Sequence, residues 1–137
     1  MSLFVDTSAL LAFLDADEPR HGDVIDTLDR SVSEARPLVT SNYVLVESFA
    51  LVQRRLGLEP LRALSDILVP MIRPIWVDEE LHAAAVAALL AANRRRLSLV
   101  DCTSFELMRR HGLTDALALD DDFTRQGFRL HPEPRPG

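Results

Sequence analysis

The chain has no lysine, and all fifteen of its basic residues are arginines. Without lysine it has no P-loop of the Gly-Lys-Ser/Thr type and no side-chain amine for Schiff-base catalysis. Its single cysteine, Cys102, excludes an internal disulfide and a metal site built from several cysteines. The four histidines are scattered and form no His-x-x-x-His pair, so the sequence does not predict a zinc site. A Gly-x-Ser-x-Gly motif is also absent, which excludes the serine nucleophile of an α/β-hydrolase.

Long hydrophobic runs are missing as well. No apolar stretch approaches the roughly 20 residues that cross a bilayer, and the N-terminus lacks the basic start of a signal peptide. We therefore expect no membrane association and a cytoplasmic location. With 137 residues, 47% of them hydrophobic and 26% charged, the chain is expected to form one globular domain over residues 1–131. The Pro-rich residues 132–137 are expected to be a flexible tail.

The N-terminal stretch MSLFVDTSALLAFLDA combines a strand with a helix. Leu3–Val5 is a short apolar run, and residues 9–14 read as a buried helix. Asp6 stands between them, at the carboxyl end of the predicted strand, where open α/β sheets bind their ligands. A second interpretation makes Asp6 only the N-cap of the helix.

Strands and helices alternate along the rest of the chain. This alternation predicts an α/β fold with a mainly parallel sheet of four or five short strands, covered by helices on both faces. Pro74 indicates that its strand lies near an edge of the sheet. Further strands are expected over 38–40, 72–77, 115–119 and 128–130, and helices over 21–34, 43–56, 59–71, 78–93 and 98–111.

Glu47 is an acidic residue in an otherwise apolar helix. Its neighbours three and four residues away include Tyr43 and Leu51, so its carboxylate emerges from an apolar face. Burying an unpaired carboxylate costs several kcal/mol, so Glu47 needs a cation or a proton. The structural alternative is an ion pair with Arg54 or Arg55.

Three further acids lie near the ends of predicted elements. Ser98-x-x-Asp101 is a possible capping box, which would give Asp101 a purely structural role. Asp120 follows the Ala-Leu-Ala-Leu strand as Asp6 follows the first one, although Asp120 and Asp122 also fit a solvated turn.

Acids at the same edge of a parallel sheet would face one crevice and repel one another. Oxygen ligands without Cys or His select Mg²⁺ or Mn²⁺, ions suited to displacement at phosphorus.

Four motifs in this order and spacing resemble the PIN-domain ribonucleases, and in particular the small VapC-type toxins of bacterial toxin–antitoxin pairs. The resemblance covers essentially the whole chain. The motifs that carry it are Val5-Asp6-Thr7-Ser8-Ala9-Leu10, Glu47 after Thr40-Ser41-Asn42, Leu99-Val100-Asp101-Cys102-Thr103-Ser104-Phe105, and Leu119-Asp120-Asp121-Asp122-Phe123 before Gly127.

The resemblance implies a three-layer α/β/α fold and Mg²⁺- or Mn²⁺-dependent endonuclease activity on RNA. It also implies a VapB-type antitoxin that blocks the site, and a homodimer. By position, the principal acids that hold the metal are Asp6, Glu47, Asp101 and Asp120, with Asp122 as the alternative fourth acid. Supporting hydroxyls that orient carboxylates or waters are Thr7, Ser8 and Thr103.

The formal net charge of −6 opposes RNA binding, because phosphate contacts come from basic side chains. We expect an arginine cluster to contact RNA, with Arg94, Arg95 and Arg96 as the candidates; the alternative is a solvated helix end. The apolar helices between residues 43 and 71 are expected to contact the antitoxin or a second copy of the chain. Cys102 and Trp76 are expected to pack against other side chains rather than to react.

One alternative function remains open at this point, and the sequence disfavours two other interpretations. A non-catalytic PIN-like module would keep the fold and bind RNA or a protein without a productive metal site. An aspartate-based phosphotransfer protein would need a lysine that this chain lacks. The carboxylates of the loop over residues 15–20 could also ligate a metal, although Pro19 and the surrounding charge favour a solvated loop.

Overall fold

A single five-stranded parallel sheet organises the protein, and the computed structural model describes residues 1–136. The strand order is β3-β2-β1-β4-β5, and every neighbouring pair is parallel. This confirms the α/β fold and the edge position that Pro74 predicted for its strand. The strands are β1 (Leu3–Val5), β2 (Leu38–Ser41), β3 (Arg73–Ile75), β4 (Asp115–Leu117) and β5 (Arg129–His131).

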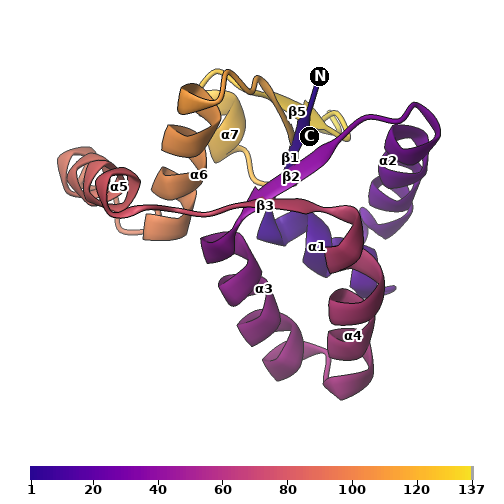
Figure 1. Ribbon diagram of the computed structural model, residues 1–137. Coiled ribbons are helices and arrows are strands. Elements are labelled where there is room, and N and C mark those ends of the chain that lie inside the picture. The colour runs from indigo at the N-terminus through magenta and orange to yellow at the C-terminus, as the bar shows by residue number, and fades with distance from the viewer. Residues whose placement is uncertain (137) are drawn as a thin grey trace.

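Helices cover both faces of the sheet and give the three layers that were expected. Figure 1 shows α5 and α6 on one side of the strands and α1, α2 and α4 on the other. The helices are α1 (Thr7–Leu14), α2 (His21–Ser33), α3 (Asn42–Arg55), α4 (Leu58–Ala63), α5 (Glu79–Ala92), α6 (Leu99–Arg110) and α7 (Asp122–Arg125), with the short turns η1 (Leu64–Leu68) and η2 (Val69–Met71).

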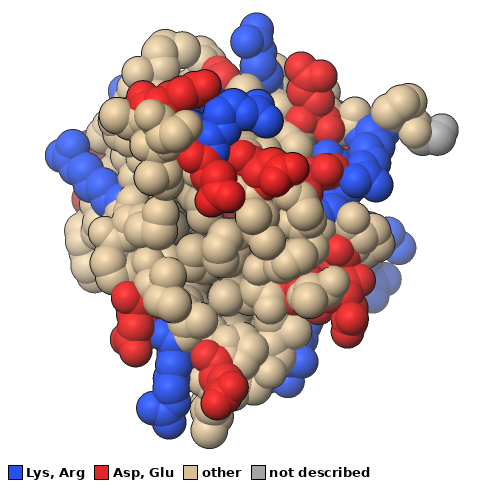
Figure 2. Space-filling view, turned by 90° about the vertical axis from the view of Figure 1, so that its right-hand side faces the viewer, with Lys and Arg blue, Asp and Glu red and all other residues tan. Residues whose placement is uncertain are grey.

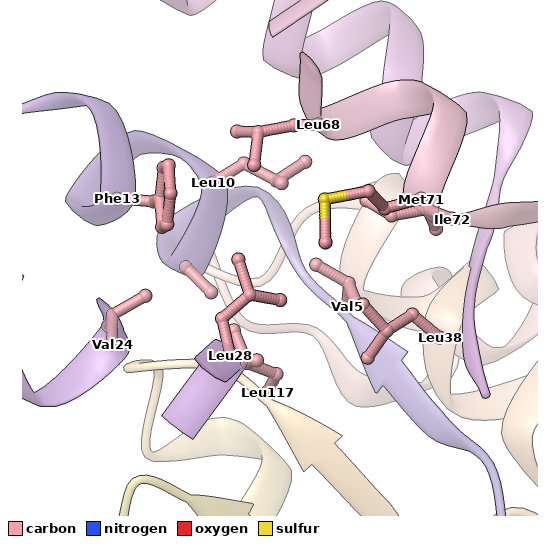
Figure 3. A pocket seen from close by; sticks show the side chains of 11 residues that line it. Val5, Leu10, Phe13, Val24, Leu28, Leu38, Leu68, Met71, Ile72 and Leu117 are labelled. Carbon is pink, nitrogen blue, oxygen red and sulfur yellow. The ribbon is translucent and has the colours of Figure 1, made fainter. Parts of the chain in front are cut away.

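The core lies against both faces of the central strand β1, whose three residues are buried. On one face Phe105 packs edge-on against Phe123, with ring centroids 5.0 Å apart. On the other face, side chains of α1, α2, η1 and η2 meet the strands around a narrow apolar cavity (Figure 3), which has room for about one water molecule. Burial on both faces explains why the strands read as apolar runs rather than alternating ones.

The segment predicted as one helix over 59–71 is divided in the structure. The α-helix α4 ends at Ala63, η1 is a π-helical turn, and η2 is a 3₁₀ turn that contains Pro70. Proline lacks the backbone N–H that an α-helix interior requires, so regular α-helix does not continue through this position. Leu64 and Leu68 belong to the core, whereas Ile67 is 60% exposed, so only part of this apolar segment is available for a partner.

The packing predictions for Cys102 and Trp76 had different outcomes. Cys102 is buried, as expected. The prediction for Trp76 is wrong, because its side chain is 73% exposed directly after the edge strand β3, where no further strand covers it. Within the described residues no helix is long and apolar enough to cross a membrane.

The C-terminal segment contacts α2. Arg20 donates to the carbonyl of Glu133 at 2.8 Å, and Arg135 pairs with Asp23 at 2.8 Å. The proposed domain boundary at residue 131 and the flexibility of the tail stay predictions; residue 137 lies outside the described residues.

Candidate metal-binding active site

Asp6 lies at the carboxyl end of β1 and is also the N-cap of α1, so both interpretations of its position hold. Its Oδ2 accepts hydrogen bonds from the Ser8 N–H at 3.1 Å and from the Ser8 hydroxyl at 2.6 Å. The side chain is buried, at 5% exposure. Burial raises the pKa of Asp6 to about 6 against the effect of these hydrogen bonds, and the charges of Asp101 and Asp120 raise it further.

Ser8 connects Asp6 to the segment that follows β4. While its hydroxyl donates to Asp6, it accepts a hydrogen bond from the Leu119 N–H at 3.0 Å. The next residue after Leu119 is Asp120. Ser8 therefore fixes the chain next to Asp120 against the start of α1, and its hydroxyl contacts the Asp6 carboxylate; a supporting role in a metal site stays a prediction.

Asp101 lies in the first turn of α6, and the capping box predicted for it is present. The Ser98 N–H donates to Asp101 Oδ2 at 3.1 Å, and the Asp101 N–H donates to the Ser98 hydroxyl at 3.0 Å. Burial raises the pKa of Asp101 despite these hydrogen bonds, and the charges of Asp120 and Glu47 add to the rise. The cap thus holds Asp101 beside two other carboxylates, which a cap alone does not require.

Glu47 is half-buried in the middle of α3. The alternative of an ion pair with Arg54 or Arg55 is not realised, because no ion pair joins Glu47 to either arginine in the part of the chain that the structure describes. Its charge contributes to the raised pKa of Asp101. Glu47 therefore lies near enough for its charge to act on Asp101, but it is not among the carboxylates whose oxygens lie within 4.8 Å of one another, which are those of Asp101, Asp120 and Asp122.

Asp120 and Asp122 differ in their surroundings. One carboxylate oxygen each from Asp101, Asp120 and Asp122 lies within 4.8 Å of the others. Asp122, however, pairs with Arg94 at 3.0 Å and with Arg125 at 2.8 Å. Although its burial opposes ionisation, these hydrogen bonds lower the pKa of Asp122. Asp122 already has two cationic partners, whereas no ion pair of Asp120 occurs among the described residues.

The donor set fits a hard divalent cation. It contains carboxylate oxygens only, without a histidine or cysteine in the group. Several like charges close together favour protonation or a bound cation. Burial is the main cause of the raised pKa values of Asp6 and Asp101, and the charges of the neighbouring carboxylates add to it. Mg²⁺ and Mn²⁺ are the ions that such ligands bind preferentially.

The sequence matches the family described as PIN domain over residues 3–129. The chain belongs to the PIN-domain family. It is 38% identical over 134 residues to the 23S rRNA-specific endonuclease VapC20 of Mycobacterium tuberculosis, covering 96% of this chain and 99% of that protein. It is 33% identical over 122 residues to the ribonuclease VapC26 of the same organism, covering 86% of each chain.

Solved structures agree with this assignment. The crystal structure of M. tuberculosis VapC20, described as a sarcin–ricin loop cleaving toxin, superposes with a TM-score of 0.80 at 36% identity, covering 93% of this PIN domain and 96% of that chain. VapBC2 from Rickettsia felis, solved with a promoter DNA fragment, shares the fold at 14% identity and a TM-score of 0.71, covering 96% and 98% of the two chains.

The two supporting threonines have different places in the PIN domain. Thr7 is buried and accepts a hydrogen bond from the hydroxyl of Ser48 at 3.2 Å, which joins α1 to α3 next to Glu47. Thr103 departs from the prediction, because its hydroxyl donates to the carbonyl of Leu99 at 2.8 Å instead of to a carboxylate. Threonine in a helix commonly bonds the carbonyl four residues earlier in this way.

The arginine cluster of the PIN domain is divided between two roles. Arg94 pairs with Asp122, 28 residues later in the sequence, and this contact was not predicted. Arg95 and Arg96 are exposed. No local signal reveals the Arg94–Asp122 pair, because its partners come from segments that only the fold brings together.

Proposed function

We propose that this PIN domain is a metal-dependent endoribonuclease that hydrolyses RNA phosphodiester bonds. The observation that supports this most strongly is the convergence of acids from different elements. Asp6 ends β1, Asp101 begins α6, and Asp120 follows β4, yet their charges act on one another. The charge of Glu47 in α3 also acts on Asp101.

Asp6, Glu47, Asp101 and Asp120 are the residues that would hold Mg²⁺ or Mn²⁺. Such an ion, when bound, lowers the pKa of a water and stabilises negative charge on a phosphate. The protein positions the ligands: Ser8 fixes the carboxylate of Asp6, and the capping box fixes that of Asp101. Fixed ligands reduce the reorganisation that accompanies catalysis. Asp122, neutralised by its arginines, borders the site without serving as a principal ligand.

The similarity to VapC20 over nearly the full length of both chains makes ribosomal RNA the first substrate to test. Purified protein is incubated with ribosomes in Mg²⁺ or Mn²⁺, and cleavage is mapped by primer extension. The proposal predicts discrete cuts that EDTA and Asp101→Asn abolish. Intact ribosomal and total cellular RNA after incubation with folded wild-type protein and either metal would contradict it and favour the alternative of a non-catalytic PIN-like module.

Phosphate contacts are proposed for Arg95 and Arg96. Both are exposed on the segment between α5 and α6, whereas Arg94 is held by Asp122. Replacing Arg95 and Arg96 with alanine is expected to weaken RNA binding and to reduce its salt dependence, because fewer counterions are released. An RNA affinity that the variant leaves unchanged at every salt concentration would show that Arg95 and Arg96 do not contact RNA and are only solvated.

A VapB-type antitoxin is the proposed protein partner, and the face formed by α2, α4, η1 and η2 is its proposed docking surface. Figure 2 shows this face with a broad uncharged area in its middle and charged side chains mainly around it. Ile67 is 60% and Met71 40% exposed, and Met71 also borders the apolar cavity of Figure 3. Apolar area of this kind is typical of a protein interface.

Two measurements address these assemblies. Ile67→Asp and Met71→Asp are expected to weaken antitoxin binding at least tenfold in calorimetry and to leave RNA cleavage by the free protein intact. Wild-type affinity in both variants would place the antitoxin elsewhere. A homodimer and a cytoplasmic location stay proposals; light scattering of the isolated protein tests the first, and a monomer mass would contradict it.

A further inference from the structure

A pocket with a cavity volume of about 350 Å³ opens directly beside the acidic group. It shares Ser8 and Asp120 with the active site, so whatever binds there lies next to the reacting phosphate. Its apolar walls come from α1, from the end of α3 and from the segment after β4: they are Leu11, Ala12, Leu56 and Leu119. This volume lies within the usual range for small-ligand pockets and accommodates one nucleotide unit.

The polar part of the pocket carries both hydrogen-bond acceptors and a donor. Asp15 and Glu18 belong to the loop between α1 and α2 and are half-buried. Asp15 Oδ1 accepts from the Asp17 N–H at 3.0 Å, and Glu18 Oε1 accepts from the Arg20 N–H at 3.2 Å. The second oxygen of each carboxylate makes no hydrogen bond within residues 1–136, so both remain available to a ligand.

Arg55 supplies the donor. It lines the pocket from the last turn of α3, is exposed, and forms no ion pair with any residue in the described part of the chain. A guanidinium and two carboxylates that face one pocket without neutralising each other can be satisfied together by a ligand that presents donors and acceptors.

A phosphate group does not suit the inner pocket, because Asp15, Glu18 and Asp120 would repel it. A neutral base with apolar faces suits both the walls and the polar groups. Guanine matches best: its N1–H and N2 amino group are adjacent donors for a carboxylate, and its O6 and N7 are the acceptors that arginine binds bidentately. Adenine presents a ring acceptor where guanine presents N1–H and a donor where guanine presents O6.

We propose that this pocket binds a guanine base adjacent to the cleaved phosphodiester bond, and that Asp15, Glu18 and Arg55 determine that preference. The proposal rests on the ribonuclease function and specifies its substrate. Single-stranded RNA is recognised in this way, by bases that leave the stack, lie between side chains and pair along their polar edges.

The test uses fluorescently labelled octauridylate strands that carry one central guanosine, inosine or adenosine. Binding is measured by anisotropy in EDTA, where metal-dependent cleavage does not occur. The guanosine strand is expected to bind at least about tenfold more tightly than the adenosine strand, and inosine, which lacks the N2 amino group, to fall between them. Equal affinities for guanosine and adenosine strands would overturn the proposal.

Variants locate the preference. The double variant Asp15→Asn/Glu18→Gln keeps the acceptors for the loop hydrogen bonds and is expected to reduce the guanosine-to-adenosine ratio to about one; Arg55→Ala is expected to weaken guanosine binding selectively. Asp17→Asn and Arg54→Ala are matched controls, because these neighbours do not line the pocket. A wild-type ratio in the double variant, or loss of antitoxin binding without any loss of guanosine preference, would assign the pocket to another occupant.

The outcome is separable from the test of the proposed function. If the protein cuts RNA in Mn²⁺ without any preference for guanosine near the cut, the base pocket is wrong and the ribonuclease stands. If no RNA is cut while guanosine binding in EDTA is selective, the pocket stands as a binding site and the nuclease proposal fails.

Discussion

The Ser8 hydroxyl lies 2.6 Å from Asp6 Oδ2 and accepts the N–H of Leu119 at the same time. Through this one oxygen, the end of β1 and the segment after β4 are held together at the carboxyl edge of the sheet. Asp6, two residues before Ser8, and Asp120, directly after Leu119, thereby come near enough for the charge of Asp120 to raise the pKa of Asp6. Their placement is thus a consequence of a hydrogen bond as well as of the strand order.

Ser8→Ala removes this connection. Its loss is expected to lower the free energy of unfolding by about 1–2 kcal/mol, because a buried acceptor and a backbone donor lose their partner. RNA cleavage is expected to fall because Asp6 and Asp120 are no longer fixed. Urea denaturation and single-turnover cleavage measure the two effects. Ser33→Ala is the control, since Ser33 is exposed and, among the described residues, its hydroxyl donates only to the carbonyl of Arg30; equal effects in both variants would contradict the role of Ser8.

Asp6 predicts a pH dependence of stability in metal-free protein. Its pKa is about 6 in the folded state, compared with its ordinary 3.8, so the folded state binds the proton more tightly than the unfolded state. The stabilisation from protonation is complete below about pH 4 and is lost as the pH rises through 6. Asp6→Asn lacks this loss and is expected to be about 3 kcal/mol more stable than wild type at pH 7.

Urea denaturation of both proteins in EDTA between pH 4 and pH 7.5 measures this difference. The two stability curves are expected to converge toward pH 4 and to separate above pH 5. A constant difference across the range would show that Asp6 is not the group that titrates. Asp17→Asn, at an exposed position in a loop, is the control and is expected to follow the wild-type curve.

The lowered pKa of Asp115, the first residue of β4, predicts the opposite pH dependence of stability. Burial opposes its ionisation, but hydrogen bonds from Thr114, His131 and Arg36 outweigh burial and lower its pKa to about 2. Because the folded-state pKa lies below the unfolded one, this stabilisation is present above about pH 4 and is lost as the pH falls toward 2. Wild type is expected to lose about 1–2 kcal/mol more than Asp115→Asn between pH 4 and pH 2. Parallel curves in acid denaturation would contradict the assignment.

The fourth acid of the site can be identified by comparing two substitutions. Asp120→Asn removes a carboxylate that has no cationic partner within residues 1–136, whereas Asp122→Asn removes one that Arg94 and Arg125 already neutralise. Cleavage is therefore expected to fall by at least about a hundredfold in Asp120→Asn and by less than about tenfold in Asp122→Asn. The reverse order would make Asp122 the principal ligand.

Local signals in the sequence predicted much of the fold and of the site. The run Leu3–Val5 followed by Asp6 identified the first strand and its acidic end, and Ser98 with Asp101 identified the start of α6, because strand runs and helix caps are encoded within a few residues. Placing these acids at one sheet edge followed from the rule that parallel strands carry their ligands at their carboxyl ends.

Contacts between distant segments could not be predicted in the same way. The ion pair of Arg94 with Asp122 depends on how α5, α6 and α7 pack, and no sequence pattern near either residue predicts it. The pocket that Asp15, Glu18 and Arg55 line could not be predicted for the same reason. The sequence of the loop over residues 15–20 is typical of a solvated loop, and the pocket exists only because the end of α3 lies beside it. The prediction for Trp76 failed because it rested on residue type alone, although Pro74 already indicated that the neighbouring strand lies at an edge of the sheet.

The central claim is that carboxylates from separate elements form one metal site, and Mn²⁺ calorimetry on metal-free, antitoxin-free protein tests it most directly. Wild type is expected to bind Mn²⁺ in the micromolar range, and Asp6→Asn/Asp101→Asn to bind none while remaining folded by circular dichroism. Asp17→Asn/Asp66→Asn, which removes two exposed carboxylates outside the group, is expected to bind as wild type does. Undiminished Mn²⁺ binding by folded Asp6→Asn/Asp101→Asn, or no binding by folded wild type, would contradict the account.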